Sequence, residues 1–89
     1  MKKKEIIELL ENFLSEMNVE GICGGWVDEE TDEDGVFWVY IILDLDWINE
    51  IPTKPEFIAS RMRLGVAEEI YNFLNIRVRV GSVARKCEK

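Results

Sequence analysis

A continuous apolar segment at residues 36–48, VFWVYIILDLDWI, constrains the fold of this chain more than any other part of its sequence. Its β-branched and aromatic composition is typical of a long strand. Because side chains alternate between the two faces of a strand, the odd-numbered positions from 37 to 47 form one wholly apolar face. The segment therefore predicts the central strand of the protein, with its odd-numbered face packed in the core.

The even-numbered face of this predicted strand is mixed. It runs from the aromatic Trp38 and Tyr40, through Ile42, to the carboxylates of Asp44 and Asp46. An apolar patch of this size is unfavourable in water, so we expect its first three residues to contact a partner. Trp and Tyr are favoured anchor residues at protein interfaces.

The length of 89 residues is sufficient for one domain with a modest core, and residues 1–4 and 86–89 are expected to fray. No apolar run reaches the roughly 20 residues that a membrane span requires. Acidic residues interrupt the apolar part of the N-terminal segment, so it does not match a signal peptide. The sequence therefore predicts a soluble cytoplasmic protein that does not bind membranes.

Charge is distributed unevenly along the chain. The net charge is −7, with 14 acidic and 3 basic residues in positions 1–53 and 4 acidic and 8 basic residues in positions 54–89. This acidity argues against nucleic acid as a partner, because such binding neutralises phosphates with Lys and Arg. The two halves are expected to attract one another, within one chain or between two copies. The absence of His and Gln beside abundant Glu, Lys, Ile and Val fits a protein from a heat-loving organism.

The two cysteines, Cys23 and Cys87, belong to no CxxC pair, and the chain has no histidine. This argues against a zinc site, and it favours two free thiols over a disulfide. The preferred prediction is that the chain has no metal site. Without histidine, the serines and cysteines lack the usual activating base of a nucleophile. The sequence therefore predicts no cofactor and no enzymatic activity.

The first part of the chain is predicted to contain a helix, a strand and a loop. Apolar residues at helical spacing predict the helix over residues 3–17. Residues 19–27, VEGICGGWV, predict an irregular or edge strand, because glycine within a strand is typical of a bulge. The acidic residues 28–35, DEETDEDG, predict a solvated hairpin loop. As a calcium loop this segment would require a glutamate where Ile41 stands, so an EF-hand is not supported.

A second helix is predicted over residues 55–74, begun by a capping box that Thr53 opens. One apolar stripe of this helix is expected to cover the sheet. A second apolar cluster, formed by Phe57, Leu64 and Tyr71, lies roughly 120–160° around the helix from that stripe. We expect this cluster either to pack against the first helix or to contact a second copy of the chain.

The alternating segment IRVRVGSVAR predicts a third strand over residues 76–85. Arg77 and Arg79 are expected to point away from the core, as Asp44 and Asp46 do. If the second and third strands are neighbours, these four side chains form ion pairs across the ladder. Exposed pairs of this kind contribute about 0.2–1 kcal/mol each.

Asp44 and Asp46, two positions apart on a strand, could share a divalent metal, and Gly24 and Gly25 precede them. With the order helix, strand, acidic strand, helix, strand, this pattern resembles the minimal core of the nucleotidyltransferases. The resemblance implies a metal-dependent enzyme that acts on nucleotides. The chain departs from that family in the long gap before Asp44, and in the third strand, where arginines stand in place of a third carboxylate.

These patterns together predict an α+β fold, a two-layer sandwich of order α-β-β-α-β with a three-stranded sheet and both helices on one face. They favour a small non-enzymatic interaction module that forms a homodimer through sheet faces or edge strands, or that binds another protein. The first alternative is a single-stranded nucleic-acid binder with Trp38 and Tyr40 as stacking platforms beside Arg77 and Arg79. The second is the nucleotidyltransferase-like domain.

Overall fold

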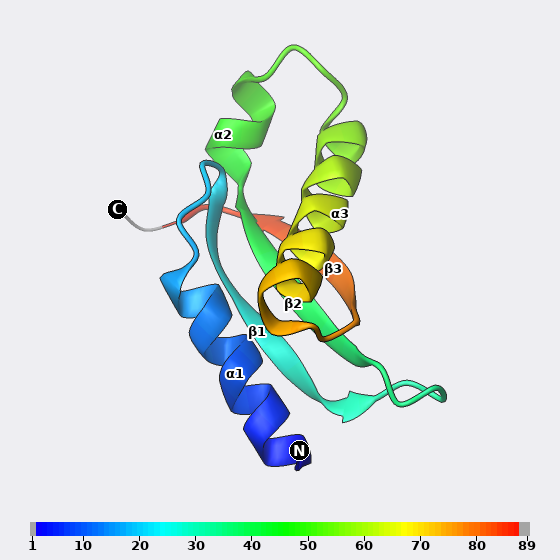
Figure 1. Ribbon diagram of the computed structural model, residues 1–89. Coiled ribbons are helices and arrows are strands. Elements are labelled where there is room, and N and C mark those ends of the chain that lie inside the picture. Colours follow the sequence, from blue (N-terminus) through cyan, green and yellow to red (C-terminus); the bar gives the residue numbers. More distant parts are fainter. Residues whose placement is uncertain (1, 88–89) are drawn as a thin grey trace.

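The computed structural model describes residues 2–87, in which helices pack on a sheet (Figure 1). In chain order the elements are α1 (Lys3–Glu16), β1 (Ile22–Thr31), β2 (Phe37–Asp44), α2 (Leu45–Glu50), α3 (Pro55–Leu74) and β3 (Val78–Arg85). The predicted α+β class is confirmed. The order differs from the prediction by one short helix, α2, which takes the place of the end of the predicted central strand.

β2 is the central strand of the sheet that the described residues form. β1 pairs with it in antiparallel orientation, from Ile22 opposite Leu43 to Thr31 opposite Phe37. β3 pairs with it in parallel orientation, beginning with Val78 opposite Phe37. The parallel pairing follows from the crossover, because α2 continues beyond the end of β2 and α3 then carries the chain back to the level at which β2 begins (Figure 1).

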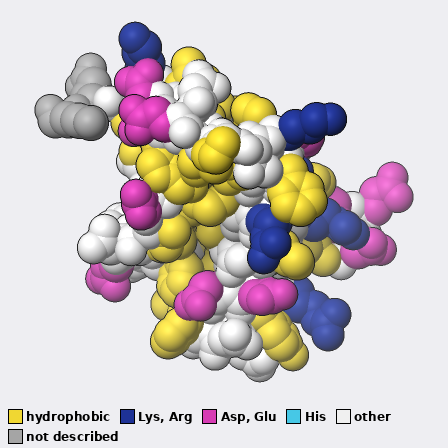
Figure 2. All heavy atoms as spheres, turned by 90° about the horizontal axis from the view of Figure 1, so that it is seen from above, with side chains coloured by type: hydrophobic (Ala, Val, Ile, Leu, Met, Phe, Trp, Pro, Cys, Tyr) yellow, Lys and Arg dark blue, Asp and Glu magenta, His cyan; other side chains and the backbone are white. Residues whose placement is uncertain are grey.

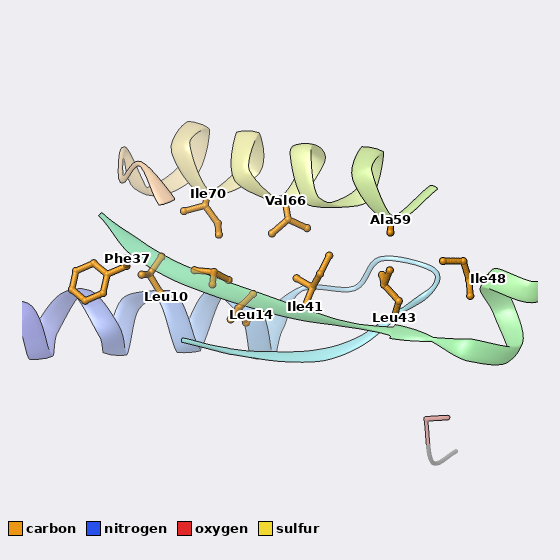
Figure 3. Packing of buried hydrophobic residues seen from close by; sticks show 10 residues of the cluster. Leu10, Leu14, Phe37, Ile41, Leu43, Ile48, Ala59, Val66 and Ile70 are labelled. Atoms are coloured by element: carbon orange, nitrogen blue, oxygen red, sulfur yellow. The ribbon is translucent and has the colours of Figure 1, made fainter. Parts of the chain in front are cut away.

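The odd-numbered side chains of β2 fill the core, as their alternation predicts. Phe37, Val39, Ile41 and Leu43 are at most 5% exposed. Fully burying one such side chain contributes about 1.5–3 kcal/mol. The buried residues that the two long helices add to this cluster are Leu10, Leu14, Ala59, Val66 and Ile70 (Figure 3). Both long helices therefore cover one face of the sheet, and the even-numbered side chains of β2 lie on the other, which we call the open face.

The strand predicted over residues 36–48 ends early, at Asp44. The Asp44 carboxylate accepts a hydrogen bond from the Asp46 backbone N–H at 3.2 Å and so caps α2. Asp is among the best residues at this position of a helix. Leu45 and Ile48, three positions apart, lie on one side of the short helix, and Ile48 is only 2% exposed. The apolar segment therefore changes from strand to helix without losing its buried side.

α3 has the predicted bounds, but the predicted role of Thr53 in starting it is wrong. The residue before the helix is Lys54, whose side chain makes no capping hydrogen bond, and Pro55 begins the first turn. Proline is favoured there because its missing N–H would have no partner in the helix. At the other end, Asn75 adopts a left-handed conformation (φ 57°) and donates its backbone N–H to the Tyr71 carbonyl at 2.9 Å.

β1 lies further along the chain than predicted. It covers Ile22–Thr31 in place of residues 19–27, so part of the predicted acidic loop is a strand. Its pairing with β2 has two register shifts, one beside Gly24 and one after Val27, which confirms the prediction of an irregular strand. Acidic side chains on such an edge strand discourage pairing with other chains.

Both chain ends carry more structure than predicted. Residues 3–4 begin α1. Cys87, two residues after β3, forms a disulfide with Cys23 of β1, with a Cα–Cα distance of 6.2 Å. The expectation of two free thiols is therefore wrong, because the fold brings together residues that are 64 positions apart. The fraying predicted for residues 1 and 88–89 lies outside the described residues.

Candidate functional site

The most exposed large apolar side chains among the described residues lie on α3. Phe73 is 72% exposed, and its ring centroid lies 6.2 Å from that of Phe13 of α1. Phe57, Leu64 and Tyr71 are 57%, 62% and 43% exposed. They are spaced seven residues apart and so form a line along the helix, with successive members about 10.5 Å apart. We call these three residues the α3 stripe. Of the two contacts that the sequence suggests for them, packing against α1 is wrong, because that contact would bury them.

Two opposite charges flank the α3 stripe. Arg61 lies three residues before Leu64 and Glu68 lies four residues after it, and both are exposed. Neither takes part in an ion pair within the described residues. Arg63, in contrast, serves the fold itself, because it donates a hydrogen bond to Ser82 Oγ of β3 at 2.8 Å. Seen from above, the molecule exposes hydrophobic side chains beside charged ones of both signs (Figure 2).

Three aromatic rings, from Trp26, Trp38 and Tyr40, form a cluster on the open face. Trp26 stacks on Tyr40 with a centroid distance of 5.1 Å, and Tyr40 stacks on Trp38 at 5.9 Å. Such stacked pairs contribute about 0.5–1.5 kcal/mol beyond the area that they bury. Trp38 and Tyr40 are half-buried as a result, and Ile42 is 9% exposed. The rings of the predicted apolar patch therefore bury part of one another's surface. The predicted exposure of Ile42 is wrong.

Gly81 of β3 makes room for this aromatic cluster. It lies opposite Tyr40 in the parallel ladder. A Cβ at this position would lie 2.7 Å from Tyr40 Cε1 and 3.7 Å from Trp38 Cζ3, and the first distance is too short for a real contact. The sequence pattern did not reveal the roles of Trp26 and Gly81, because they depend on which residues of the neighbouring strands lie beside Tyr40.

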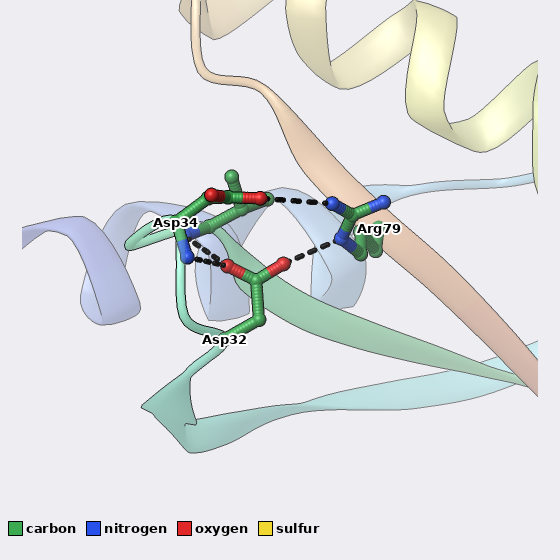
Figure 4. Close-up of polar contacts among 4 residues, drawn as sticks. Asp32, Asp34 and Arg79 are labelled. Atoms are coloured by element: carbon green, nitrogen blue, oxygen red, sulfur yellow. Dashed lines mark hydrogen bonds and ion pairs between the residues drawn. The ribbon is translucent and has the colours of Figure 1, made fainter.

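Asp32 holds the loop between β1 and β2. Its Oδ1 accepts hydrogen bonds from the backbone N–H groups of Asp34 and Val36, both at 2.9 Å. Its Oδ2 accepts a hydrogen bond from Arg79 Nε of β3 at 2.5 Å, and Asp34 adds a contact of 3.6 Å to Arg79 Nη2 (Figure 4). The Arg79 hydrogen bond, followed by that from Val36, holds the pKa of Asp32 below its usual value, and Asp32 in turn raises the pKa of Arg79. The acidic loop is therefore tied to the sheet.

The predicted ion pairs of Asp44 and Asp46 with Arg77 and Arg79 are wrong. Because β3 runs parallel to β2, Arg79 lies near the start of β2, whereas the two aspartates lie at and beyond its end. Arg79 pairs with the β1–β2 loop instead. The Arg77 guanidinium lies over an aromatic ring of α3, that of Tyr71, at 5.4 Å from its centroid.

These positions also remove support from the two alternative functions. The nucleotidyltransferase resemblance rests on two carboxylates on one strand, but Asp46 belongs to α2. Within residues 2–87, no group of three or more His, Cys, Asp and Glu side chains is arranged to hold a metal. The nucleic-acid alternative needs free arginines beside Trp38 and Tyr40, but Arg79 contacts two carboxylates.

Comparisons with protein-family models, curated proteins and solved structures give no match to this chain. In the described part of the chain, no helix combines the length and the apolarity that crossing a membrane requires. The α3 stripe, with Arg61 and Glu68 beside it, is the candidate site that the geometry supports best.

Proposed function

We propose that this chain is a non-enzymatic, self-associating module of the cytoplasm, and that two copies pair through the α3 stripe. The observation that supports the proposal is the exposure of Phe57, Leu64 and Tyr71 along one line of the helix. Removing apolar surface from water contributes about 25 cal/mol per Å². The stripe therefore favours a partner with a similar line of apolar side chains. The α3 stripe of a second copy is such a partner.

Charge complementarity supports a second copy in antiparallel orientation. With Leu64 at the two-fold axis, Phe57 lies opposite Tyr71 of the partner subunit. Arg61 then lies beside Glu68 of the partner subunit, because the two residues stand at nearly equal distances on either side of the axis. Two-fold symmetry forms this ion pair twice. A parallel pair in the same register would place these residues of the two copies on opposite sides of the contact, so neither ion pair would form.

The proposed contact is small. α3 has 20 residues and is therefore about 30 Å long. A single pair of helices buries less surface than the roughly 1,200–2,000 Å² of a standard stable interface. We therefore expect a weak dimer, with a dissociation constant in the micromolar range.

Sedimentation equilibrium from low to high micromolar concentration tests the proposal. The mass of the wild-type chain is expected to rise from that of a monomer to that of a dimer. Leu64→Glu would place two carboxylates at the axis and leave them without partners, so this variant is expected to stay monomeric. Leu9→Glu is the matched control, because Leu9 is an exposed leucine of α1 (37%), and it is expected to keep the dimer.

Two results would contradict the proposal. One is a wild-type chain that remains monomeric over the whole concentration range. The other is a dimer that survives Leu64→Glu but is lost in Trp26→Glu, since Trp26 lies on the open face and is 41% exposed. That second result would show that the copies pair through the sheet.

A further inference from the structure

The disulfide between Cys23 and Cys87 joins the two edge strands of the sheet across its central strand. Cys23 belongs to β1, and Cys87 follows β3 by two residues. β1 and β3 are not neighbours, because β2 lies between them. In Figure 1 the end of β3 crosses behind β2, on the side away from α3, and the chain continues toward the upper end of β1. The link therefore lies on the open face, near the end of β2.

The residues around this link form one shallow cavity. It is lined by Cys23, Ile42, Arg85, Lys86 and Cys87, and Cys23 Sγ lies 3.6 Å from the Ile42 carbonyl oxygen. Ile42 is 9% exposed, although no described helix covers its face and its neighbour on β1, Gly24, has no side chain. The segment that carries Cys87 thus covers the end of β2 beside the aromatic cluster.

The surroundings of the two sulfur atoms suit thiol–disulfide exchange. Cys23 is an exposed residue and Cys87 is half-buried, so a small thiol has access to the bond. Arg85 and Lys86 directly precede Cys87 and line the same cavity. Positive side chains beside a cysteine favour its thiolate, which is the form that attacks a disulfide.

We propose that Cys23 and Cys87 form a reversible redox clasp, which small disulfides close and small thiols open. To close it, the Cys87 thiolate attacks one sulfur of a small disulfide such as oxidised glutathione, forms a mixed disulfide and releases one glutathione thiolate. The Cys23 thiolate then attacks the Cys87 sulfur and releases the second glutathione. The two protein thiols lose two protons and two electrons, and one oxidised glutathione becomes two glutathione molecules.

The two states of the clasp differ on the open face. In the closed state residues 86–87 are held over β2. In the open state they are no longer tied to β1, and Ile42 becomes accessible. The clasp lies on the face opposite α3, so it acts independently of the pairing proposed above and goes beyond it.

Intact-mass measurement of the full chain in glutathione buffers of graded ratio tests the proposal. In oxidised glutathione the wild-type monomer is expected to lose the mass of two hydrogen atoms and to show no free thiol. Excess reduced glutathione is expected to reverse both changes. Cys23→Ser, which keeps only Cys87, is expected instead to gain one glutathionyl group.

Structural consequences are measured on the same samples. We expect backbone amides of residues 40–44 to exchange faster with solvent in the open state, and the urea midpoint to be lower than in the closed state. Cys23→Ser/Cys87→Ser is the control and is expected to show one midpoint in both buffers.

Several results would overturn the clasp. They are two glutathionyl groups on the wild-type chain, a disulfide between two chains, free thiols that persist in oxidised glutathione, or equal exchange of residues 40–44 in both buffers. All of these can occur whether or not α3 pairs, so they do not bear on the proposed dimer.

Discussion

Arg79 of β3 donates a hydrogen bond to Asp32 of the β1–β2 loop, although the two residues are 47 positions apart. β2 lies between the segments that carry them, so the contact spans the sheet at the start of β2. The disulfide between Cys23 and Cys87 spans it at the other end. The central strand is therefore crossed twice, once by an ion pair and once by a covalent bond.

Asp32→Asn is expected to lower stability in a pH-dependent way. The substitution keeps an oxygen for the loop N–H groups but removes the charge that pairs with Arg79. The pKa of Asp32 is lower in the folded chain than its ordinary value of 3.8. The contribution of its carboxylate to the free energy of unfolding is therefore complete above pH 3.8 and is lost as the pH falls through the pKa of the folded chain. Urea midpoints of wild type and variant should therefore differ at pH 7 and converge below pH 3.8.

Glu33→Gln is the control for this prediction, because it removes an exposed charge from the same loop. Its urea midpoint is expected to stay close to that of the wild-type chain. A difference between wild type and Asp32→Asn that remains constant down to pH 2 would mean that the Arg79 contact contributes nothing to stability.

Asp44 is expected to behave as a helix cap. Asp44→Ala removes the oxygen that accepts from the Asp46 N–H and should cost about 0.5–2 kcal/mol of unfolding free energy. Asp44→Asn should be nearly neutral, because Asn caps helices about as well as Asp. Urea denaturation of both variants checks this prediction. Equal losses in the two variants would point to a role for the charge in place of the cap.

Two glycines are expected to respond oppositely to alanine. Gly81→Ala places a Cβ against the Tyr40 ring and should cost about 1–3 kcal/mol, as overpacking usually does. Gly65 lies inside α3, and a Cβ there would meet nothing within 4 Å. Gly65→Ala should therefore stabilise the chain by about 1 kcal/mol through helix propensity. Thermal or urea denaturation measures both changes, and a stabilised Gly81→Ala would show that the aromatic cluster shifts without cost.

Arg61 and Glu68 are expected to set the orientation of the proposed dimer. Arg61→Glu and Glu68→Arg each replace two attractive contacts by repulsive ones. Since exposed pairs contribute about 0.2–1 kcal/mol each and 1.4 kcal/mol corresponds to a factor of ten, each variant should weaken dimerisation roughly tenfold. The double variant restores the pairs with reversed sign and should recover the wild-type dissociation constant in sedimentation. A double variant weaker than either single one would exclude the antiparallel arrangement.

Several features could be predicted from the sequence because they depend on neighbouring residues alone. The odd-numbered positions of β2 are buried as their alternation indicates, and α3 has the bounds that its periodicity indicates. Asp44 shows where this reasoning is limited, because an apolar segment ending in Asp is compatible with a longer strand or with a capped helix. Whether the strand continues or the helix begins depends on tertiary packing, because Ile48 has to reach the buried cluster.

Only the tertiary structure decided which distant residues meet. The sequence determined that the third strand alternates and that Arg79 lies off the core face, but not that Arg77 precedes β3 and lies over Tyr71, nor that β3 runs parallel to β2. That direction brings Arg79 to Asp32 and Cys87 to Cys23, and it separates Arg79 from Asp44. The physical reason is that periodicity acts over a few residues, whereas strand order and direction follow from how whole helices pack over the shared core.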